Sequence, residues 1–527
     1  MLLPKLCRGC LPGLAALAGA CHSPAPPPTP LARRLPARQV LADLALLQRI
    51  KEAADAGLYK YHSKRQLDSA FAAACARVTG PLTVLEAYRL VAELTDYEGS
   101  LHNDTALPDS VRRALHAETA YFPYPLKLVA GQLLVNATGA ALPPGTVVHG
   151  INGHPAGQLV RALGVYYTTD GRNQTGKQIG LAESFAEYYR WHYGPQTTFA
   201  VRYSLPTAPA DTLQRQLPAV SYAATERAFA RRHSRPSDHD YFEEPRRRYS
   251  FRRLPQQQAA LLTLPTFSLG EDSTAGHRQY ARFLDSCFRV LRCTPAIRSL
   301  VVDLRANGGG DDNNDMLAFS YLTARPFREH RAARVAFGRV PYRQYLTVAK
   351  DTAERAAIVA EAARVLRREF APGAGEQWQG AAAGNPVFQP RPLRFRGLVY
   401  LLVSPRVASA GSMFAAMVRG NTPAVVVGEE TMGGYYGHTG HQSLEYTLPN
   451  TGIRVSFAWV DLDQAVPPRP TQPPGRGILP DIPVAQSPAD FLANRDAALQ
   501  RVLQLLEPQQ SPRHPASSLQ LITATAP

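Results

Sequence analysis

The stretch Val399–Gly420, V-Y-L-L-V-S-P-R-V-A-S-A-G-S-M-F-A-A-M-V-R-G, joins a compact apolar run to a run of small residues. The apolar run is typical of a buried strand, and Ser404-Pro405 indicates a turn. The small residues predict a helix that begins near Ser409. A serine at such a junction meets the positive end of the helix dipole, which stabilises negative charge developing on its oxygen. Ser409 and Ser412 are therefore both candidate nucleophiles, and a plain helix N-cap is the alternative for either.

A second glycine-rich junction follows another apolar run, at Leu300–Gly310, L-V-V-D-L-R-A-N-G-G-G. Backbone N–H groups are exposed where a strand runs into glycines, and glycine lets a ligand atom approach closely. No Gly-Lys-Ser/Thr follows, so the pattern of a phosphate-binding P-loop is absent. Donors for an oxyanion are the better interpretation.

Both junctions belong to a longer alternation of strand and helix patterns. Compact apolar runs that helical stretches separate predict a layered βαβ core in the α/β class. The predicted buried strands are Ala259–Leu264, Ser299–Leu304, Leu398–Val403 and Ala424–Gly428.

The segments before this core differ from it in pattern. Apolar residues at helical spacing give way to short strands and turns, and then to a polar, arginine-rich stretch that predicts a solvated connector. The predicted organisation is a signal peptide at 1–20, a Pro-rich tether at 21–36, a helical domain at 37–125, a PDZ-like domain at 126–206, a connector at 207–258, the core at 259–506 and a disordered tail at 507–527.

The predicted PDZ-like domain rests on one motif. The run 143–156, P-P-G-T-V-V-H-G-I-N-G-H-P-A, resembles the central motif of PDZ domains, with Thr146 where that motif has Asp. Asn152-Gly153 is a hairpin turn signal. PDZ domains take extended peptides by adding a strand to a sheet edge. A closed domain that only spaces its neighbours is the alternative.

The N-terminus carries export features. Lys5 and Arg8 precede the short apolar run 11–20, which is too short to span a bilayer and favours a signal peptide. The run ends in A-G-A-C, which resembles the lipobox of bacterial lipoproteins and predicts lipidation of Cys21. The expected location is the bacterial cell envelope, with the protein attached to the lipid bilayer by this anchor.

Four blocks in the core carry a family resemblance. They resemble, in order, the blocks of the tail-specific (C-terminal processing) peptidases, whose core is a crotonase-like layered fold. In that family the serine of the second block is the nucleophile, which implies Ser409, with oxyanion donors at Gly308 or Gly309 and Ala410. The blocks are D-L-R-A-N-G-G-G at 303–310, V-A-S-A-G-S-M-F-A-A-M at 407–417, G-E-E-T-M-G-G at 428–434 and G-R-G-I-L-P-D at 475–481.

One departure from the family pattern concerns the base. The Ser-Lys peptidases carry their lysine directly after the G-E-x-T-x-G block, and Gly434 stands there in this sequence. No lysine follows Lys350, so a Ser-Lys dyad at the usual place is excluded. The other branch, similar to the tricorn protease core, uses Ser, His and Glu with the histidine in the helical domain.

The resemblance to the tricorn core implies His102 as the general base, in E-G-S-L-H-N-D-T at 98–105. A base far away in sequence is ordinary, because geometry defines a triad. His438 and His441 are the rival bases. The candidates for the orienting acid are Asp461, Asp463 and Glu429.

The composition limits the function classes. The 527 residues carry a net charge of +16, yet the arginines are spread through every segment and form no basic stripe with aromatics, so no nucleic-acid partner is expected. No cofactor and no metal site are predicted, since His438 and His441 lack a convincing third ligand. The predicted function is a serine-type endopeptidase acting on proteins or peptides through an acyl-enzyme on Ser409. The alternative is a catalytically inactive peptide-binding scaffold of the same fold.

Overall fold

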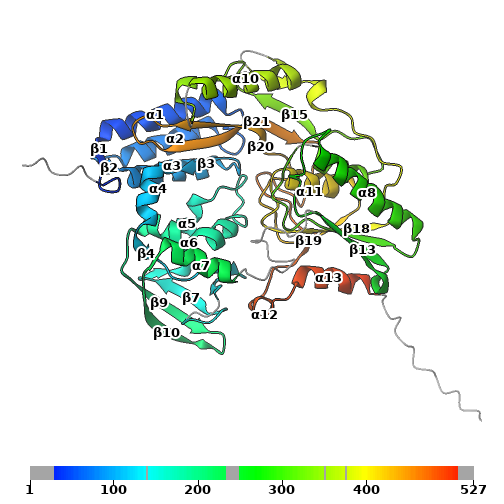
Figure 1. The fold of residues 1–527 in the computed structure, drawn as a ribbon, viewed down its shortest axis with the longest axis horizontal. Coiled ribbons are helices and arrows are strands. Elements are labelled where there is room, and N and C mark those ends of the chain that lie inside the picture. Colours follow the sequence, from blue (N-terminus) through cyan, green and yellow to red (C-terminus); the bar gives the residue numbers. More distant parts are fainter. Residues whose placement is uncertain are drawn as a thin grey trace, which may run out of the picture.

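The computed structural model describes residues 29–137, 141–232, 249–311, 313–348, 352–373 and 377–507 (Figure 1). The predicted signal peptide, Cys21 and the predicted C-terminal tail beyond residue 507 lie outside the described residues. Among the described residues, no helix has the length and apolar character needed to cross a membrane.

Helices form the N-terminal domain, as the apolar spacing predicts. Ser63 and Thr83 cap two of them through capping boxes, in which the cap hydroxyl accepts from the third backbone N–H of the helix. The helices are α1 (Ala37–Ala54), α2 (Lys64–Ala76), α3 (Val84–Glu98) and α4 (Asp109–His116), joined by the short strands β1 (Arg34–Leu35), β2 (Leu82–Thr83), β3 (Asp104–Ala106) and β4 (Thr119–Tyr121).

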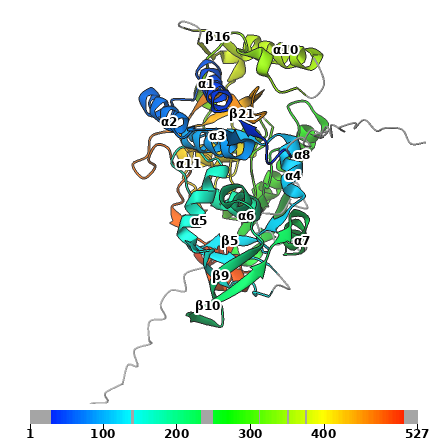
Figure 2. The same ribbon diagram turned by 90° about the vertical axis from the view of Figure 1, so that its left-hand side faces the viewer.

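An antiparallel sheet in the strand order β10-β9-β7-β6-β5 follows, at the bottom of the molecule in both views (Figures 1 and 2). The predicted turn at Asn152-Gly153 joins β7 to β8, with positive φ at both residues. The elements are β5 (Leu126–Val129), β6 (Gln132–Val135), β7 (Val147–Ile151), β8 (His154–Pro155), α5 (Ala156–Leu163), η1 (Gly164–Tyr166), α6 (Lys177–Tyr193), β9 (Thr198–Leu205) and β10 (Ala208–Pro218).

The prediction of a solvated connector at 207–258 is wrong for most of that stretch. Strand β10 pairs with β9 over most of its length, yet nearly all its side chains are exposed. Such an edge strand has the composition of a connector, because only its backbone is engaged by the sheet. After it come β11 (Val220–Ser221), α7 (Tyr222–Arg232) and β12 (Ser250–Leu254), which already belongs to the core.

The core sheet has the order β12-β13-β14-β18-β19-β22, and all its strands except β12 are parallel. All four predicted buried strands are present within one residue of their predicted ends. Helices α8, α9 and α11 cover one face, and α13 packs on the other. The elements are β13 (Ala259–Thr263), α8 (Ala275–Cys293), β14 (Ser299–Asp303), α9 (Asn314–Ser320), β18 (Leu398–Val403), α11 (Ala410–Asn421), β19 (Val425–Gly428), β22 (Ile482–Pro483), α12 (Pro488–Leu492) and α13 (Ala497–Leu506).

A second sheet, with the order β16-β17-β15-β21-β20, connects the core to the N-terminal helices, and β3 pairs with β21. In both views the orange strand β21 runs beside the blue helices (Figures 1 and 2). Its elements are β15 (His330–Val335), α10 (Thr352–Glu369), β16 (Phe370–Pro372), β17 (Trp378–Gly380), β20 (Thr439–Thr447) and β21 (Arg454–Gln464), and the short helices η2 (Pro255–Gln257), η3 (Arg343–Tyr345) and η4 (Ala382–Gly384) complete the described elements.

Candidate active site

Ser409 lies between the core strand β18 and helix α11, as the sequence predicts. Its backbone has φ 50° and ψ −131°, a strained conformation for a residue other than glycine. A serine nucleophile at a sharp turn between strand and helix typically has such a geometry. The turn lies against the glycine-rich junction of the neighbouring strand β14, because a Cβ atom on Gly309 would come within 2.7 Å of the Ser409 Cβ. Only glycine at 309 leaves room for this approach.

His102 lies beside the candidate nucleophile. Its Nε2 is 3.1 Å from the Ser409 hydroxyl, a hydrogen-bond distance between residues 307 positions apart. The His102 loop leaves α3 at Gly99, which ends the helix with φ 74°. The Ser100 hydroxyl accepts from the His102 N–H at 3.3 Å and contacts the Thr439 hydroxyl at 2.5 Å. Strand β20, which carries Thr439, thus helps to hold the loop.

Burial keeps the His102 ring neutral at physiological pH. It lowers the pKa of His102 to about 4, and a hydrogen-bonding interaction with the Thr439 backbone offsets only part of that effect. The Nδ1 atom is buried and makes no hydrogen bond of ordinary geometry to the described residues. A neutral imidazole whose Nε2 faces a hydroxyl can accept its proton.

The rival histidines take other positions. The His438 ring is 1% exposed and packs 5.2 Å from the His102 ring, at a tilt of 30°. Burial and the nearby His102 both lower the pKa of His438 well below its usual value. His441 faces His330, with ring centres 6.2 Å apart. The histidine at hydrogen-bond distance from Ser409 is therefore His102.

Two backbone N–H groups remain as oxyanion donors. Of the two predicted alternatives, Gly308 and Gly309, the Gly309 N–H is already engaged, because it donates to the Asn307 side chain at 2.8 Å. Asn307 in turn donates to the Leu264 carbonyl at 2.9 Å and so fixes the loop. The N–H groups of Gly308 and Ala410 have no acceptor among the described residues. Ala410 is also the first residue of α11, where the helix dipole favours negative charge.

Ser412 is a structural residue of the helix and not a second nucleophile. Its hydroxyl donates to the Ser409 carbonyl at 2.7 Å, and the residue is fully buried. A side chain that bonds back to the preceding turn of its own helix points away from any substrate.

None of the three candidate acids contacts His102, so these predictions are corrected. Asp461 lies 2.6 Å from Lys60 and 3.0 Å from Arg334, and Asp463 lies 3.2 Å and 2.6 Å from the same two cations. The two aspartates and two cations form one ion-pair network. The sequence could not reveal it, because its members lie far apart along the chain.

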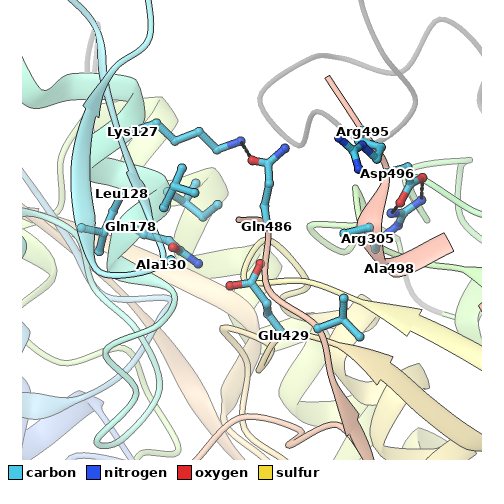
Figure 3. Close-up of a pocket in the computed structure, with 14 residues that line it drawn as sticks. Lys127, Leu128, Ala130, Gln178, Arg305, Glu429, Gln486, Arg495, Asp496 and Ala498 are labelled. Carbon is cyan, nitrogen blue, oxygen red and sulfur yellow. Dashed lines mark hydrogen bonds and ion pairs between the residues drawn. The ribbon is translucent and has the colours of Figure 1, made fainter. Parts of the chain in front are cut away.

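Glu429 lines a pocket between the antiparallel domain and the core (Figure 3). Burial raises the pKa of Glu429, and a hydrogen bond from Gln178 opposes that rise. Gln178 lines the same pocket, as do Lys127 and Gln486, which are hydrogen-bonded to each other at 3.1 Å. Before the G-R-G-I-L-P-D block the buried polar side chain is Gln472, which accepts from the Leu479 N–H at 3.0 Å. That position holds an amide, not a carboxylate.

A residue that sequence reasoning missed connects the two halves of the site. The fully buried Asp170 carboxylate accepts from the Leu101 N–H at 3.0 Å and from the Gly434 N–H at 2.8 Å. Burial raises the pKa of Asp170 to about 7, although both backbone bonds and Lys60 oppose the rise. Asp170 thus bridges the His102 loop and the glycine that replaces the family's lysine. A lone aspartate in T-T-D-G-R gives no signal of this role.

The fold is similar to that of solved structures. Mature CPAF matches with a TM-score of 0.57 and 13% identity over 89% of this chain and 96% of its own. Mature CPAF complexed with lactacystin matches with a TM-score of 0.55 and 13% identity, over 89% and 98%. The photosystem II D1 C-terminal processing protease gives a TM-score of 0.37 at 13% identity, over 89% and 98%. No curated protein sequence matches the chain.

A family model supports the sequence resemblance directly. Residues 258–484 match the model of peptidase family S41. The matched range contains the strand–turn–helix junction of Ser409 and the glycine-rich junction of Gly308. This part of the chain, residues 258–484, is thus similar to peptidase family S41, and the protein is a serine-type peptidase, as the resemblance to the tail-specific peptidases predicts.

Proposed function

We propose that the protein is a cell-envelope endopeptidase that cleaves proteins or peptides with Ser409 as nucleophile and His102 as general base. The observation that supports this most directly is the 3.1 Å separation of His102 Nε2 and the Ser409 hydroxyl. A serine hydroxyl is a poor nucleophile at neutral pH unless a neighbouring group accepts its proton. The neutral His102 ring is that group.

The proposed reaction is acyl transfer in two halves. His102 accepts the Ser409 proton as the oxygen attacks the peptide carbonyl, and the N–H groups of Gly308 and Ala410 stabilise the oxyanion. His102 then donates the proton to the leaving amine, which gives an acyl-enzyme. In the second half a water molecule, activated by His102, releases the acyl group and restores the hydroxyl. Two amide donors on rigid junctions need no rearrangement when the charge forms.

The orientation of His102 is proposed to come from the backbone, not from a carboxylate. Its partner is the Thr439 main chain, whose interaction with the ring raises the His102 pKa. A backbone carbonyl close enough to accept from Nδ1–H would fix the tautomer in which Nε2 is free to accept a proton. Burial is the main cause of the low pKa of His102. A neutral partner stabilises the imidazolium less than a carboxylate does, so it offsets that effect of burial only in part.

The antiparallel domain is proposed to present the substrate. Strand β5 is at the end of its sheet, and Leu128 and Val129 of that strand line the pocket of Figure 3. An edge strand can receive an extended peptide as one more strand. The pocket opens between this strand and the core, so a peptide bound there would run towards the core domain.

The envelope location is proposed from the sequence alone. The apolar run 11–20 and the A-G-A-C ending favour export and lipidation at Cys21. The test is to compare wild type with Cys21→Ser in membrane and soluble fractions. Acyl chains dominate such attachment, so the variant should leave the membrane fraction. Equal retention of both proteins, with no lipid mass on the wild type, would reject the anchor.

Covalent labelling tests the catalytic proposal. A fluorophosphonate probe reacts with an activated serine, so wild type should be labelled and Ser409→Ala should not. Peptide mapping should find the label on Ser409. Ser412→Ala is the matched control, because it removes a hydroxyl from the same helix, and it should label like wild type. Labelling that persists in Ser409→Ala would exclude this nucleophile.

A further inference from the structure

Three side chains that can bind metals meet at one end of the second sheet. Glu329 directly precedes β15, His330 is the first residue of β15, and His441 lies in β20. One ligand atom of each lies within 4.8 Å of the other two. We propose that Glu329, His330 and His441 form a binding site for one divalent transition metal ion, with zinc as the expected ion.

The burial of the cluster supports a cation. Glu329 is 7% exposed and His330 is 4% exposed. The His330 Nδ1 has no hydrogen-bond partner among the described residues, and it lies 3.9 Å from the Glu329 carboxylate, beyond hydrogen-bond distance. A buried ring nitrogen without a hydrogen-bond partner is costly, and a buried carboxylate favours a positive charge beside it. A cation bound between them would satisfy both.

A β-bulge in β20 orients His441, the third proposed ligand. The register of β20 with β21 shifts between Gly440 and Ser443, and His441 has φ 62°. A bulge breaks the alternation of a strand and redirects one side chain, and a left-handed backbone at a residue other than glycine needs support from its surroundings. This bulge brings His441 to His330 although β21 separates their two strands.

The donor set indicates the class of metal. Two imidazoles and one carboxylate are a typical zinc set that leaves a further position open, whereas calcium takes six to eight oxygens. Two amide oxygens, on Gln464 and Asn385, are also buried without a partner among the described residues. The same two side chains donate to the backbone carbonyls of Glu329 and His330.

Zinc titration tests the site, with the full chain carrying Ser409→Ala so that it cannot digest itself. The protein is purified without a histidine tag, stripped with a chelator and titrated with zinc against a chromophoric chelator. One equivalent should bind with a Kd of about 1 µM or tighter. His441→Ala and the isosteric Glu329→Gln should each weaken binding about tenfold or more. His192→Ala, which removes a histidine from α6, should bind like the parent.

The second outcome to separate is zinc bound by the adjacent rings of His102 and His438. If His102→Ala or His438→Ala abolishes binding while His441→Ala keeps it, the proposed ligands are wrong. Absence of a stoichiometric site in the parent also overturns the proposal. Circular dichroism in excess chelator checks that each variant is folded, and His441→Gln replaces His441→Ala if the latter is not.

Discussion

The two residues that meet at the active site, Ser409 and His102, are positioned in opposite ways. Ser409 is placed by its own neighbourhood: a buried strand ends at Val403, a helix begins at Ala410, and the serine is the strained residue between them. His102 lies in a loop whose position depends on Asp170, 69 residues after Leu101, and on Thr439, 339 residues after Ser100. The nucleophile is a local feature of the sequence, and the base is a product of the tertiary fold.

Ser409→Ala should have the largest effect on turnover. Removal of the hydroxyl removes the atom that forms the acyl-enzyme, so peptide hydrolysis should fall by about 10⁴-fold or more. The measurement is kcat/KM on a quenched fluorescent peptide. Because the local junction places this residue, the free energy of unfolding should stay within about 1 kcal/mol of wild type. A variant that loses activity by unfolding would not separate catalysis from structure.

His102→Ala should lower kcat by about 10²–10⁴-fold, the usual scale for loss of a general base. The variant should still fold and still bind a peptide product. His438→Ala is the matched control, since it removes the adjacent buried imidazole, and it should retain more activity than His102→Ala. The reverse order would assign the base to the β20 segment and not to the loop after α3.

The dependence of activity on pH tests whether His102 acts in its neutral form. Burial lowers the pKa of His102 to about 4, and the base works only when neutral. Activity should therefore rise with pH through an ionisation far below the ordinary histidine value of about 6.5. His102→Ala should abolish this ionisation. A rise centred near 6.5 that His102→Ala removes would show that the ring is less buried in the working enzyme.

Asp170→Asn should lower activity by a smaller factor, because Asp170 affects His102 only through the loop that carries it. The carboxylate accepts two backbone N–H bonds, and an amide can accept only on its oxygen. We expect kcat/KM to fall by about tenfold, because one of the two loops loses its bond and the alignment of His102 suffers. Asp170→Ala should be at least as impaired.

The pH profile distinguishes this role of Asp170 from a loss of packing. The pKa of Asp170 is about 7, so deprotonation near neutral pH should tighten both loops and add a second rise in activity. Asp170→Asn should lose that rise and keep the ionisation of His102. An unchanged profile in Asp170→Asn would contradict the positioning role.

Ser412→Ala should have the smallest effect. The Ser409 carbonyl that accepts from Ser412 also accepts from the Met413 N–H at 2.9 Å, so it does not become unpaired. Loss of one hydroxyl bond should cost about 1 kcal/mol of stability. Activity and fluorophosphonate labelling should stay within a few-fold of wild type. If Ser412→Ala were as inactive as Ser409→Ala, the conclusion that Ser412 is only a structural residue of helix α11 would be wrong.

The sequence predicts features that are determined locally, such as the position of Ser409, better than features that depend on the tertiary fold, such as the position of His102. The strand at Leu398–Val403 and the serine after it are determined by a pattern within one window, and the structure has that strand at those residues. The resemblance to the tricorn core was needed to select His102 among fourteen histidines. The structure then brings its ring to Ser409.

The predictions that failed depend on long-range contacts. Asp461 and Asp463 look like free carboxylates in the sequence, but Lys60 neutralises them from about 400 positions away. Asp170 was missed because both of its donors come from distant loops. The edge strand β10 was missed because its side chains remain in solvent and only its backbone is paired.

Strand β21 bears on whether the matched core can fold alone. Residues 258–484 include the β20–β21 hairpin, and the Asp43 carboxylate of α1 accepts from the backbone N–H groups of Asn450 and Thr451 at its turn. Lys51 lies 4.0 Å above the Phe457 ring and forms buried ion pairs with Asp55 and Glu98.

A fragment cut to the boundaries of the family match would leave this hairpin without its helical cover. The buried Phe457 ring would lose the Lys51 side chain that covers it, and one flank of β21 would lose its partner β3. Exposed apolar strands that lack a partner self-associate. Recombinant production of the catalytic machinery therefore has to begin upstream of α1, and the helical domain is as much a folding requirement of the core as a source of its histidine.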